Sequence, residues 1–321
     1  MTPLWEDAVE NSKYFLASPI GLISRASAFS ETARRRYRQL LVETILLAAA
    51  MELSKVVGFL RRFAPIELAE TWDNVGLLLE PTVCRVQKVL LTNDLTESVV
   101  DEAVNSKANL IVSYHPLIFF PVKRICQDTW KSRIIVRCLE NRIAVYSPHT
   151  SWDHVHGGVN DWLAKAFNQH PLKIDDIQQL KALPQDLPEG FPGAGIGRKL
   201  TLEKPVSFED ALRMVKQHVR LERVRVARPL QVKQIQHIGL CAGSGVSLMR
   251  LVPHGTFDLI LTGEMSHHDT LDFVQNGSYV ILCEHSNTER GFLREFKGVL
   301  EEELHLEVEV STVDRDPLNV E

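Results

Sequence analysis

The amino-acid sequence predicts an α/β protein of two lobes, each built on a mostly parallel sheet. From Met51 to the C-terminus, short apolar segments alternate with segments of helical period. This alternation is typical of parallel strands that helices cover on both faces. It breaks once, over residues 168–197, where four prolines and four glycines stand among charged residues. We therefore expect an N-terminal lobe over 51–167, a linker over 168–197 and a C-terminal lobe over 198–321.

In the first half, apolar strands are expected between amphipathic helices. Thr96 is suited to cap the helix that follows it, because acidic residues come directly behind it. The predicted helices are Met51–Phe63, Thr96–Ser106, Trp130–Glu140 and Val159–Phe167, and the predicted strands are Val86–Thr92, Ala108–Ser113 and Ile143–Tyr146. Glu70–Glu80 is expected to turn into a further short apolar run.

The same alternation returns in the second half. The predicted helices are Phe208–Val219, His267–Gln275 and Thr288–Leu304, and the predicted strands are Ile235–Leu240, Asp258–Leu261, Tyr279–Cys283 and Leu306–Val310. Apolar strands of this kind are buried on both faces of a sheet, so the second lobe should resemble the first in its layers.

Charge and cysteine content restrict the class of protein. Lys and Arg number 36 against 41 Asp and Glu, for a formal net charge of −5, which gives no electrostatic reason to expect nucleic acid or an anionic membrane as a partner. No apolar run reaches the roughly 18 uncharged residues of a membrane helix. Five cysteines without a CxxC pair fit reduced thiols, and we expect a cytoplasmic or nuclear location.

Residues 1–50 are interpreted apart from the rest. Their arginines and serines have some features of a transit peptide, but Glu6, Asp7 and Glu10 lie where a mitochondrial targeting segment lacks acids. An extension with an alternative translation start, or a segment wrongly joined when the gene's exons were assigned, explains these residues equally well. Met51 opens a clean amphipathic helix and is expected to begin the folded part.

Candidate functional residues follow the predicted strands. In open α/β sheets, ligands collect beyond the carboxyl ends of the strands. Histidines and carboxylates gather there in this chain: Asn93–Asp94, Tyr114–His115, His149, Asp153, His154, His156, Glu264, His267, His268, His285 and Glu289. This concentration predicts a metal site.

Cys283–Gly291 (CEHSNTERG) has the sharpest pattern. Asn287 is suited to cap the next helix, which would place Glu289 in its first turn, facing the same cleft as His285. With His115 and Asp153 from earlier strand ends, these residues form a mixed nitrogen and oxygen set that suits Zn²⁺, Mn²⁺ or Fe²⁺. A structural role, with Glu289 stabilising the helix and His285 bonded within a loop, stays open on this basis.

Two other segments of the chain allow a functional reading beside a structural one. Cys241–Gly245 (CAGSG) follows a strand and could offer backbone amides to a phosphate, although a tight turn explains it as well and the Lys-Ser/Thr ending of a P-loop is absent. Cys283 could act as a nucleophile beside His285, but its place inside an apolar strand favours a buried structural thiol.

Several stretches together resemble the NGG-interacting factor 3-like (NIF-3-like) family, whose members are also called GTP cyclohydrolase I type 2 homologues. The resemblance covers most of the chain from Met51 onward, in family order. It is carried by ETWDNVGLLLE (Glu70–Glu80), SYHPLIFFPVKRI (Ser113–Ile125), SPHTSWDHVHGGVNDWLA (Ser147–Ala164), LCAGSG (Leu240–Gly245), LTGEMSHHDTLD (Leu261–Asp272), CEHSNTERGFL (Cys283–Leu293) and DRDPL (Asp314–Leu318).

The resemblance implies two α/β lobes that enclose a dinuclear metal cleft, in proteins that form dimers or rings of dimers. The family's metal ligands fall on the same four residues that follow the predicted strands, His115, Asp153, His285 and Glu289. It also implies that His268 lines the cleft and that Asp73 and Asn74 lie near it.

This chain departs from the family pattern twice. Bacterial members carry a second histidine where this chain has Tyr114, and a phenol is a poorer ligand than imidazole at neutral pH, so we expect one divalent ion per chain to bind tightly and a second weakly or not at all. The family's inserted α/β domain does not fit into residues 168–197, so we expect a NIF-3-like fold without it.

Two functions from different classes are consistent with this pattern. The first is a metal-dependent hydrolase of a nucleotide or a phosphorylated small molecule, with His268 or Glu264 as the proton shuttle. The second is a protein-interaction factor in transcriptional corepression that keeps a vestigial metal site, with a transcription regulator as partner. Both agree with a homodimer.

Overall fold

The computed structural model describes residues 50–168, 173–182 and 191–319. The chain divides after Ala50, and the following account concerns the part from Met51 onward by itself. The predicted N-terminal extension therefore lies outside the described residues, apart from Ala50. The α/β class and the two sheets that the sequence predicts are confirmed in this part.

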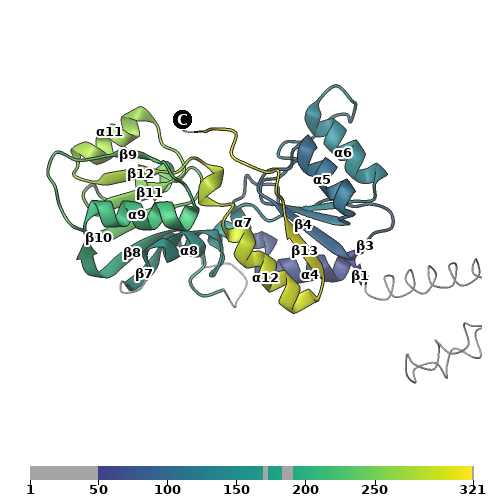
Figure 1. The fold of residues 1–321 in the computed structure, drawn as a ribbon, viewed down its shortest axis with the longest axis horizontal. Coiled ribbons are helices and arrows are strands. Elements are labelled where there is room, and N and C mark those ends of the chain that lie inside the picture. Colours follow the sequence, from purple (N-terminus) through teal and green to yellow (C-terminus); the bar gives the residue numbers. More distant parts are fainter. Residues whose placement is uncertain (1–49, 169–172, 183–190, 320–321) are drawn as a thin grey trace, which may run out of the picture. The chain divides into compact units, whose positions relative to one another are not determined.

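The first sheet has five strands in the order β13-β4-β5-β6-β2, and every neighbouring pair is parallel except β6 with β2. Its strands are β2 (Gly76–Leu79), β4 (Lys88–Thr92), β5 (Leu110–Ser113), β6 (Ala144–Ser147) and β13 (Glu307–Val310). Figure 1 shows β13, the last strand of the chain, lying beside β4 from the first half. This sheet is mostly parallel, as predicted.

Both faces of the first sheet are buried, since successive side chains of a strand point to opposite sides. Ile111 of β5 belongs to an apolar core with α5 (Glu97–Ser106) and α6 (Trp130–Glu140). Its neighbours Leu110 and Val112 belong to a second core that includes α4 (Leu53–Phe63) and α12 (Phe292–Leu304). The predicted cap is confirmed, because Oγ1 of Thr96 accepts a hydrogen bond from the backbone of Val99.

The second sheet has six strands in the order β7-β8-β10-β11-β12-β9 and is mixed, whereas the sequence predicts a mostly parallel sheet in this lobe too. Only the central strands β10 to β12 are parallel to one another, and the outer ones are antiparallel to their neighbours. Helix α9 (Phe208–Val219) packs on one face, in the same core as α4 and α12. Helices α10 (Val246–Met249) and α11 (His267–Gln275) bound a smaller core on the other face. The strands are β7 (Ile174–Ala182), β8 (Gly195–Val206), β9 (Arg225–Ala227), β10 (Ile235–Cys241), β11 (Leu259–Thr262) and β12 (Tyr279–Leu282).

The remaining described elements are short or join the two sheets. An aromatic cluster links α4 to α12, where Phe63 lies 4.9 Å from Phe296 and Trp152 lies 4.3 Å from Phe296, measured between ring centroids. The elements are β1 (Met51–Glu52), paired with β3 (Arg85–Val86), η3 (Ile66–Leu68), α7 (Thr150–His154), α8 (Val159–Ala164), η4 (Lys165–Phe167), α10 (Val246–Met249), α11 (His267–Gln275) and η5 (Ser286–Thr288).

Three further expectations about the organisation were wrong. Residues 168–197 are not a plain linker, because β7 and the start of β8 lie within them. Strand β7 is an edge strand on which no side chain of Ile174–Lys181 is buried, so its polar sequence lacks an apolar strand signal. The C-terminal residues do not all belong to the second lobe, because β13 completes the first sheet.

The third wrong expectation concerns the last long helix. It begins at Phe292 and not at Thr288, and the 3-10 turn η5 precedes it. Asn287 lies within η5 and donates from its side chain to the carbonyl of Cys283, so it does not cap α12. Glu289 therefore lies in the bend between the two helices.

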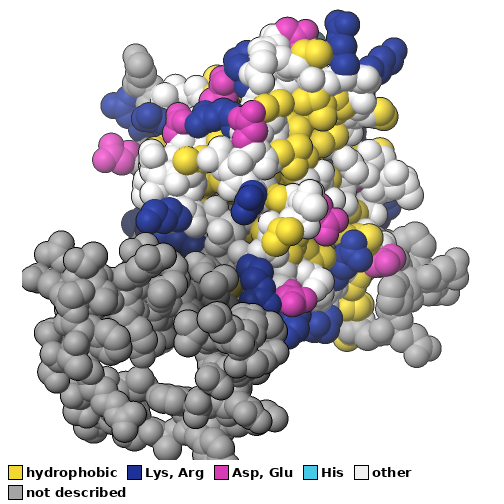
Figure 2. All heavy atoms as spheres, turned by 90° about the vertical axis from the view of Figure 1, so that its right-hand side faces the viewer, with side chains coloured by type: hydrophobic (Ala, Val, Ile, Leu, Met, Phe, Trp, Pro, Cys, Tyr) yellow, Lys and Arg dark blue, Asp and Glu magenta, His cyan; other side chains and the backbone are white. Residues whose placement is uncertain are grey.

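The first lobe also presents apolar surface to solvent. Figure 2 shows hydrophobic side chains gathered in a band on the face that this lobe turns outward, with charged side chains around it. Among the described residues of this lobe, Phe120, Val83 and Trp72 are 76%, 68% and 58% exposed. Exposed apolar surface of this kind marks contact sites in many proteins.

No helix of the described residues is long and apolar enough to cross a membrane.

Candidate metal centre

Three predicted ligands meet where the strand ends of the two sheets face each other. His115 follows β5, His285 follows β12, and Glu289 follows η5. One ligand atom from each lies within 4.8 Å of the others. His115 is at least 170 positions away from His285 and Glu289 in the sequence, and the fold brings the three residues together. This triad is the candidate metal centre.

The two imidazoles are held in the same way. Nδ1 of His115 lies 2.9 Å from Oδ1 of Asp94, and Nδ1 of His285 lies 2.8 Å from Oε1 of Glu264. A carboxylate can only accept, so each Nδ1 carries the proton, and in the neutral ring Nε2 is left with its lone pair. Metal-binding histidines are oriented by carboxylates in this manner.

Both Nε2 atoms point at one buried carboxylate. Nε2 of His115 lies 3.5 Å from Oε2 of Glu289, and Nε2 of His285 lies 3.3 Å from Oε1 of the same residue. Glu289 is only 3% exposed, and its Oε2 also accepts a hydrogen bond from Nδ2 of Asn93. Ligand atoms about 2.1 Å from one tetrahedral ion lie about 3.4 Å apart, so these separations suit a shared ion.

The glycine loop after β10 closes one side of the triad. Gly243 adopts a φ of +61°, and a Cβ placed there would lie 2.8 Å from Oε1 of Glu289 and 3.0 Å from Nε2 of His285. Only glycine fits this approach. The CAGSG segment, for which the sequence allows a phosphate loop or a tight turn, therefore passes close to Glu289 and His285 of the candidate metal centre.

The charges around the triad favour a cation. Burial lowers the pKa of His285, but the carboxylates of Glu289 and Glu264 outweigh it and raise that pKa to about 10. The pKa of His115 is also raised, because Glu289 and Asp94 outweigh its burial. Burial opposes ionisation of Glu289 too, yet the two imidazoles lower its pKa. Two imidazoles among three carboxylates therefore provide both the donors and the negative charge that a divalent ion requires.

Asp153, the fourth predicted ligand, is buried beside the triad but is not part of that group of atoms. The hydroxyl of Tyr114 donates to its Oδ1 over 2.6 Å. Burial raises the pKa of Asp153 to about 7, and Glu289 adds to this effect from nearby. Tyr114 therefore stabilises a carboxylate that would otherwise lie unpaired in the interior.

His149 is a neighbour of the site that the predicted ligand set omitted. Its ring centroid lies 5.4 Å from that of His115, and its Nδ1 lies 2.7 Å from Oδ1 of Asp73. It adopts a φ of +34°, a strained conformation for a residue with a side chain. Its position directly after β6 was the available signal. Asp73, expected near the site from the family resemblance, is thus the residue that orients His149.

The two predicted proton shuttles differ in their surroundings. Glu264 is in contact with the triad through His285, and its side chain is 48% exposed. His268 is exposed at the start of α11, where its ring lies 5.4 Å from that of His267. No described contact joins His268 to the triad, so its role stays a prediction.

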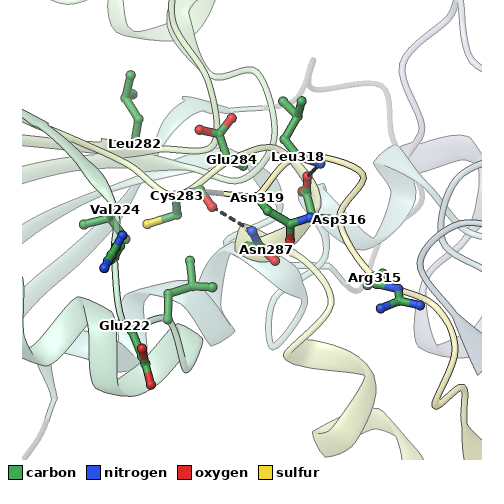
Figure 3. A pocket seen from close by; sticks show the side chains of 12 residues that line it. Glu222, Val224, Leu282, Cys283, Glu284, Asn287, Arg315, Asp316, Leu318 and Asn319 are labelled. Carbon is green, nitrogen blue, oxygen red and sulfur yellow. Dashed lines mark hydrogen bonds between the residues drawn. The ribbon is translucent and has the colours of Figure 1, made fainter. Parts of the chain in front are cut away.

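A cavity of about 530 Å³ lies behind the loop that carries His285 (Figure 3). Glu284 and Asn287 line it together with Asp316 of the C-terminal segment. Asp316 accepts a hydrogen bond from Ser286, and Glu284 pairs with Arg225 of β9 at 2.6 Å. None of the triad lines this cavity, whose walls fix the loop from the rear.

Comparisons with known proteins agree with this architecture. The chain is 46% identical to NIF3-like protein 1 of Drosophila melanogaster over 84% of its own length and 89% of the relative's. It is 39% identical to NGG1-interacting factor 3 of Saccharomyces cerevisiae, over 84% of this chain and 97% of that one.

Among solved structures, a hypothetical protein of Staphylococcus aureus superposes with a TM-score of 0.72 at 26% identity, over 84% of this chain and 99% of that one. Reduced HcgD from Methanocaldococcus jannaschii gives a TM-score of 0.69 at 25% identity, over 81% of this chain and 98% of that one. A model of the Duf34/NIF3 (NGG1p interacting factor 3) family matches residues 51–317. The two-lobed fold and these matches together show that the chain belongs to the Duf34/NIF3 family.

Proposed function

We propose that this protein is a divalent-metal-dependent hydrolase of a nucleotide or another phosphorylated small molecule. The observation that carries the proposal is the convergence of two carboxylate-oriented imidazoles, His115 and His285, on the buried carboxylate of Glu289. These three residues would hold one ion, Zn²⁺, Mn²⁺ or Fe²⁺. Asp153 is kept as a further carboxylate ligand, because its charge interacts with His115 and Glu289.

The chemistry divides between the ion and the chain. A bound divalent ion lowers the pKa of water and stabilises negative charge on a phosphate. Glu264 orients His285, and its half-exposed carboxylate can also pass a proton to solvent. Tyr114, which replaces a bacterial histidine, engages Asp153 and so favours one tightly bound ion over two.

A second function is favoured by one relative. The yeast protein is named for its interaction with NGG1, and by analogy this chain would act through a protein partner, as a homodimer in the cytoplasm or nucleus. The apolar surface of the first lobe offers a place for such contact. In this case the metal would stabilise the fold without turnover.

One comparison separates the two. Metal content and phosphate release from nucleotides, sugar phosphates and phosphodiesters are measured for the wild type, Glu289→Gln and the control Glu295→Gln. Glu295 is an exposed residue of α12 that pairs with Lys165. A hydrolase loses metal and turnover in Glu289→Gln only. Metal retention by the wild type without turnover on any substrate favours the interaction protein, and a wild type that binds no divalent ion contradicts both.

A further inference from the structure

A pair of aromatic rings, the exposed Trp72 and the half-buried Phe119, lies next to the candidate metal centre. Trp72 is 58% exposed, and its ring centroid lies 6.0 Å from that of Phe119. Both rings contact His149, at 6.1 Å and 6.3 Å between centroids. The ring of His149 lies in turn 5.4 Å from that of His115. An unbroken series of ring contacts therefore leads from solvent to the metal residues.

The two segments that carry these rings are tied to each other and to the site. Nδ2 of Asn74 donates to the carbonyl of Ile118 over 2.5 Å, which joins the residues that follow Trp72 to those that precede Phe119. Asp73 accepts hydrogen bonds from Thr150 while it holds His149. The two chain segments that carry the rings are thus tied together before any ligand arrives, which reduces the entropy that binding costs.

The arrangement of the rings defines how a ligand can use them. The planes of Trp72 and Phe119 are inclined by 55°. Stacked atoms need about 3.5 Å on each side of a ring, so centroids 6.0 Å apart leave no room for a third ring between them. A planar ligand must lie on the outer face, where Trp72 is exposed, and sequence-tolerant stacking of this kind is a common way to hold a base.

We propose that Trp72 and Phe119 form a stacking surface for a planar aromatic ring, whose ligand also carries a phosphate held at the metal centre. The proposal rests on the proposed function and narrows its substrate class to nucleotide-like molecules. Its occupant follows from continuity with the site, because Trp72 is only two ring contacts away from His115. Asn74 ties the two segments of this surface together, and Asp73 next to it holds His149 beside the site.

Calorimetry on the full chain with saturating Mn²⁺ tests the proposal with two probes. Guanosine 5′-monophosphate carries a ring, and ribose 5-phosphate presents the same sugar phosphate without one. We expect the wild type to bind the nucleotide more tightly than ribose 5-phosphate. Trp72→Ala should lower the affinity for the nucleotide by about 10-fold and leave the affinity for ribose 5-phosphate unchanged. Trp72→Phe should restore most of the affinity, because a ring remains.

Trp130→Ala is the matched control. Trp130 is 46% exposed, lies under Lys131, and has no described ring contact with the site histidines. Equal nucleotide affinity in the wild type and Trp72→Ala would overturn the proposal, as would an equal loss for both probes. If Trp72→Ala instead changes the oligomeric state in sedimentation without changing nucleotide affinity, the surface is a contact between copies and the proposal is wrong.

The outcomes separate this proposal from the proposed function. Turnover of phosphorylated substrates without any preference for a ring would support the hydrolase function and contradict the stacking surface. Ring-dependent binding without turnover would support the stacking surface and contradict the hydrolase function.

Discussion

Asn93 donates its side-chain amide to Oε2 of Glu289 over 3.1 Å. Its backbone N–H donates to Oδ2 of Asp314 over 2.8 Å, and Arg290 pairs with the same carboxylate at 3.2 Å. The C-terminal segment therefore supports the buried carboxylate of the candidate metal centre through one asparagine. Groups in this position orient a ligand without touching the ion.

Asn93→Ala should accordingly weaken metal binding. Because the amide fixes the carboxylate of Glu289, we expect about a 10-fold to 100-fold loss of affinity for Zn²⁺ or Mn²⁺ in calorimetric titration. Asn141→Ala, at an exposed position after α6, is the control and should bind as the wild type does. Unchanged affinity in a folded Asn93→Ala would show that Glu289 needs no support from it.

Gly243→Ala tests the close approach of the glycine loop. A methyl group there would lie 2.8 Å from Oε1 of Glu289, so we expect metal affinity to fall by about 10-fold or more. Gly277→Ala is a control for backbone strain, because Gly277 also has a positive φ, +87°, with nothing near a new Cβ. Each variant should lose roughly 1–2 kcal/mol in free energy of unfolding from strain. Equal metal affinity in the two would contradict a steric role for Gly243.

Tyr114→His should change the number of ions. We expect the wild type to bind fewer than two ions tightly per chain, and the variant to bind more, because it gains an imidazole and frees Asp153 from the phenol. Tyr114→Phe removes the hydroxyl without adding a ligand and should not raise the stoichiometry. Elemental analysis after dialysis measures all three, and two tight ions in the wild type would refute the prediction.

A buried ion pair should set part of the acid stability. Arg198 is 2% exposed and donates to both oxygens of Asp161, at 2.5 Å and 3.0 Å. Burial raises the pKa of Asp161, but Arg198 outweighs it, so the pKa lies below the ordinary value of 3.8. The pair's contribution is therefore complete above the unfolded pKa and is lost as the pH falls through the folded one.

Asp161→Asn should lower the free energy of unfolding by about 3 kcal/mol near neutral pH, since it leaves Arg198 buried without a charge partner. The difference from the wild type should shrink below about pH 4, where the wild-type carboxyl also loses its charge. Denaturant titrations at several pH values measure this, with Glu301→Gln, from the exposed pair with Lys297, as the control. A difference that stays constant down to the acid transition would contradict the assignment.

The sequence predicts the central strands and all of the triad, because the strands and the residues that follow them each have a local sequence signal. Leu110–Ser113 is buried on both faces, so its apolar composition marks it as a strand, and His115 follows it directly. Strand β7 lies at a sheet edge and keeps a polar sequence, which conceals it. The sheet that Leu306–Val310 joins depends on long-range pairing, which no local pattern records.

The roles of the residues around the triad are similarly divided. That Glu264 holds His285, and that Tyr114 holds Asp153, depends on contacts between segments that are far apart in sequence. The start of α12 was misplaced because Asn287 has the residue type of a helix cap, yet its amide bonds to the carbonyl of Cys283. Local preference was overruled there by the bend that positions Glu289.

Strand β13 has a consequence for the order of assembly. It lies at the edge of the first sheet and pairs with β4, from which about 215 residues of chain separate it. During synthesis, β4 to β6 emerge early, but their sheet keeps an open edge at β4 until the residues of β13 have been made. The lobe whose synthesis begins first is thus completed last. An incomplete chain whose synthesis stops within the second lobe carries a first lobe with the edge at β4 exposed.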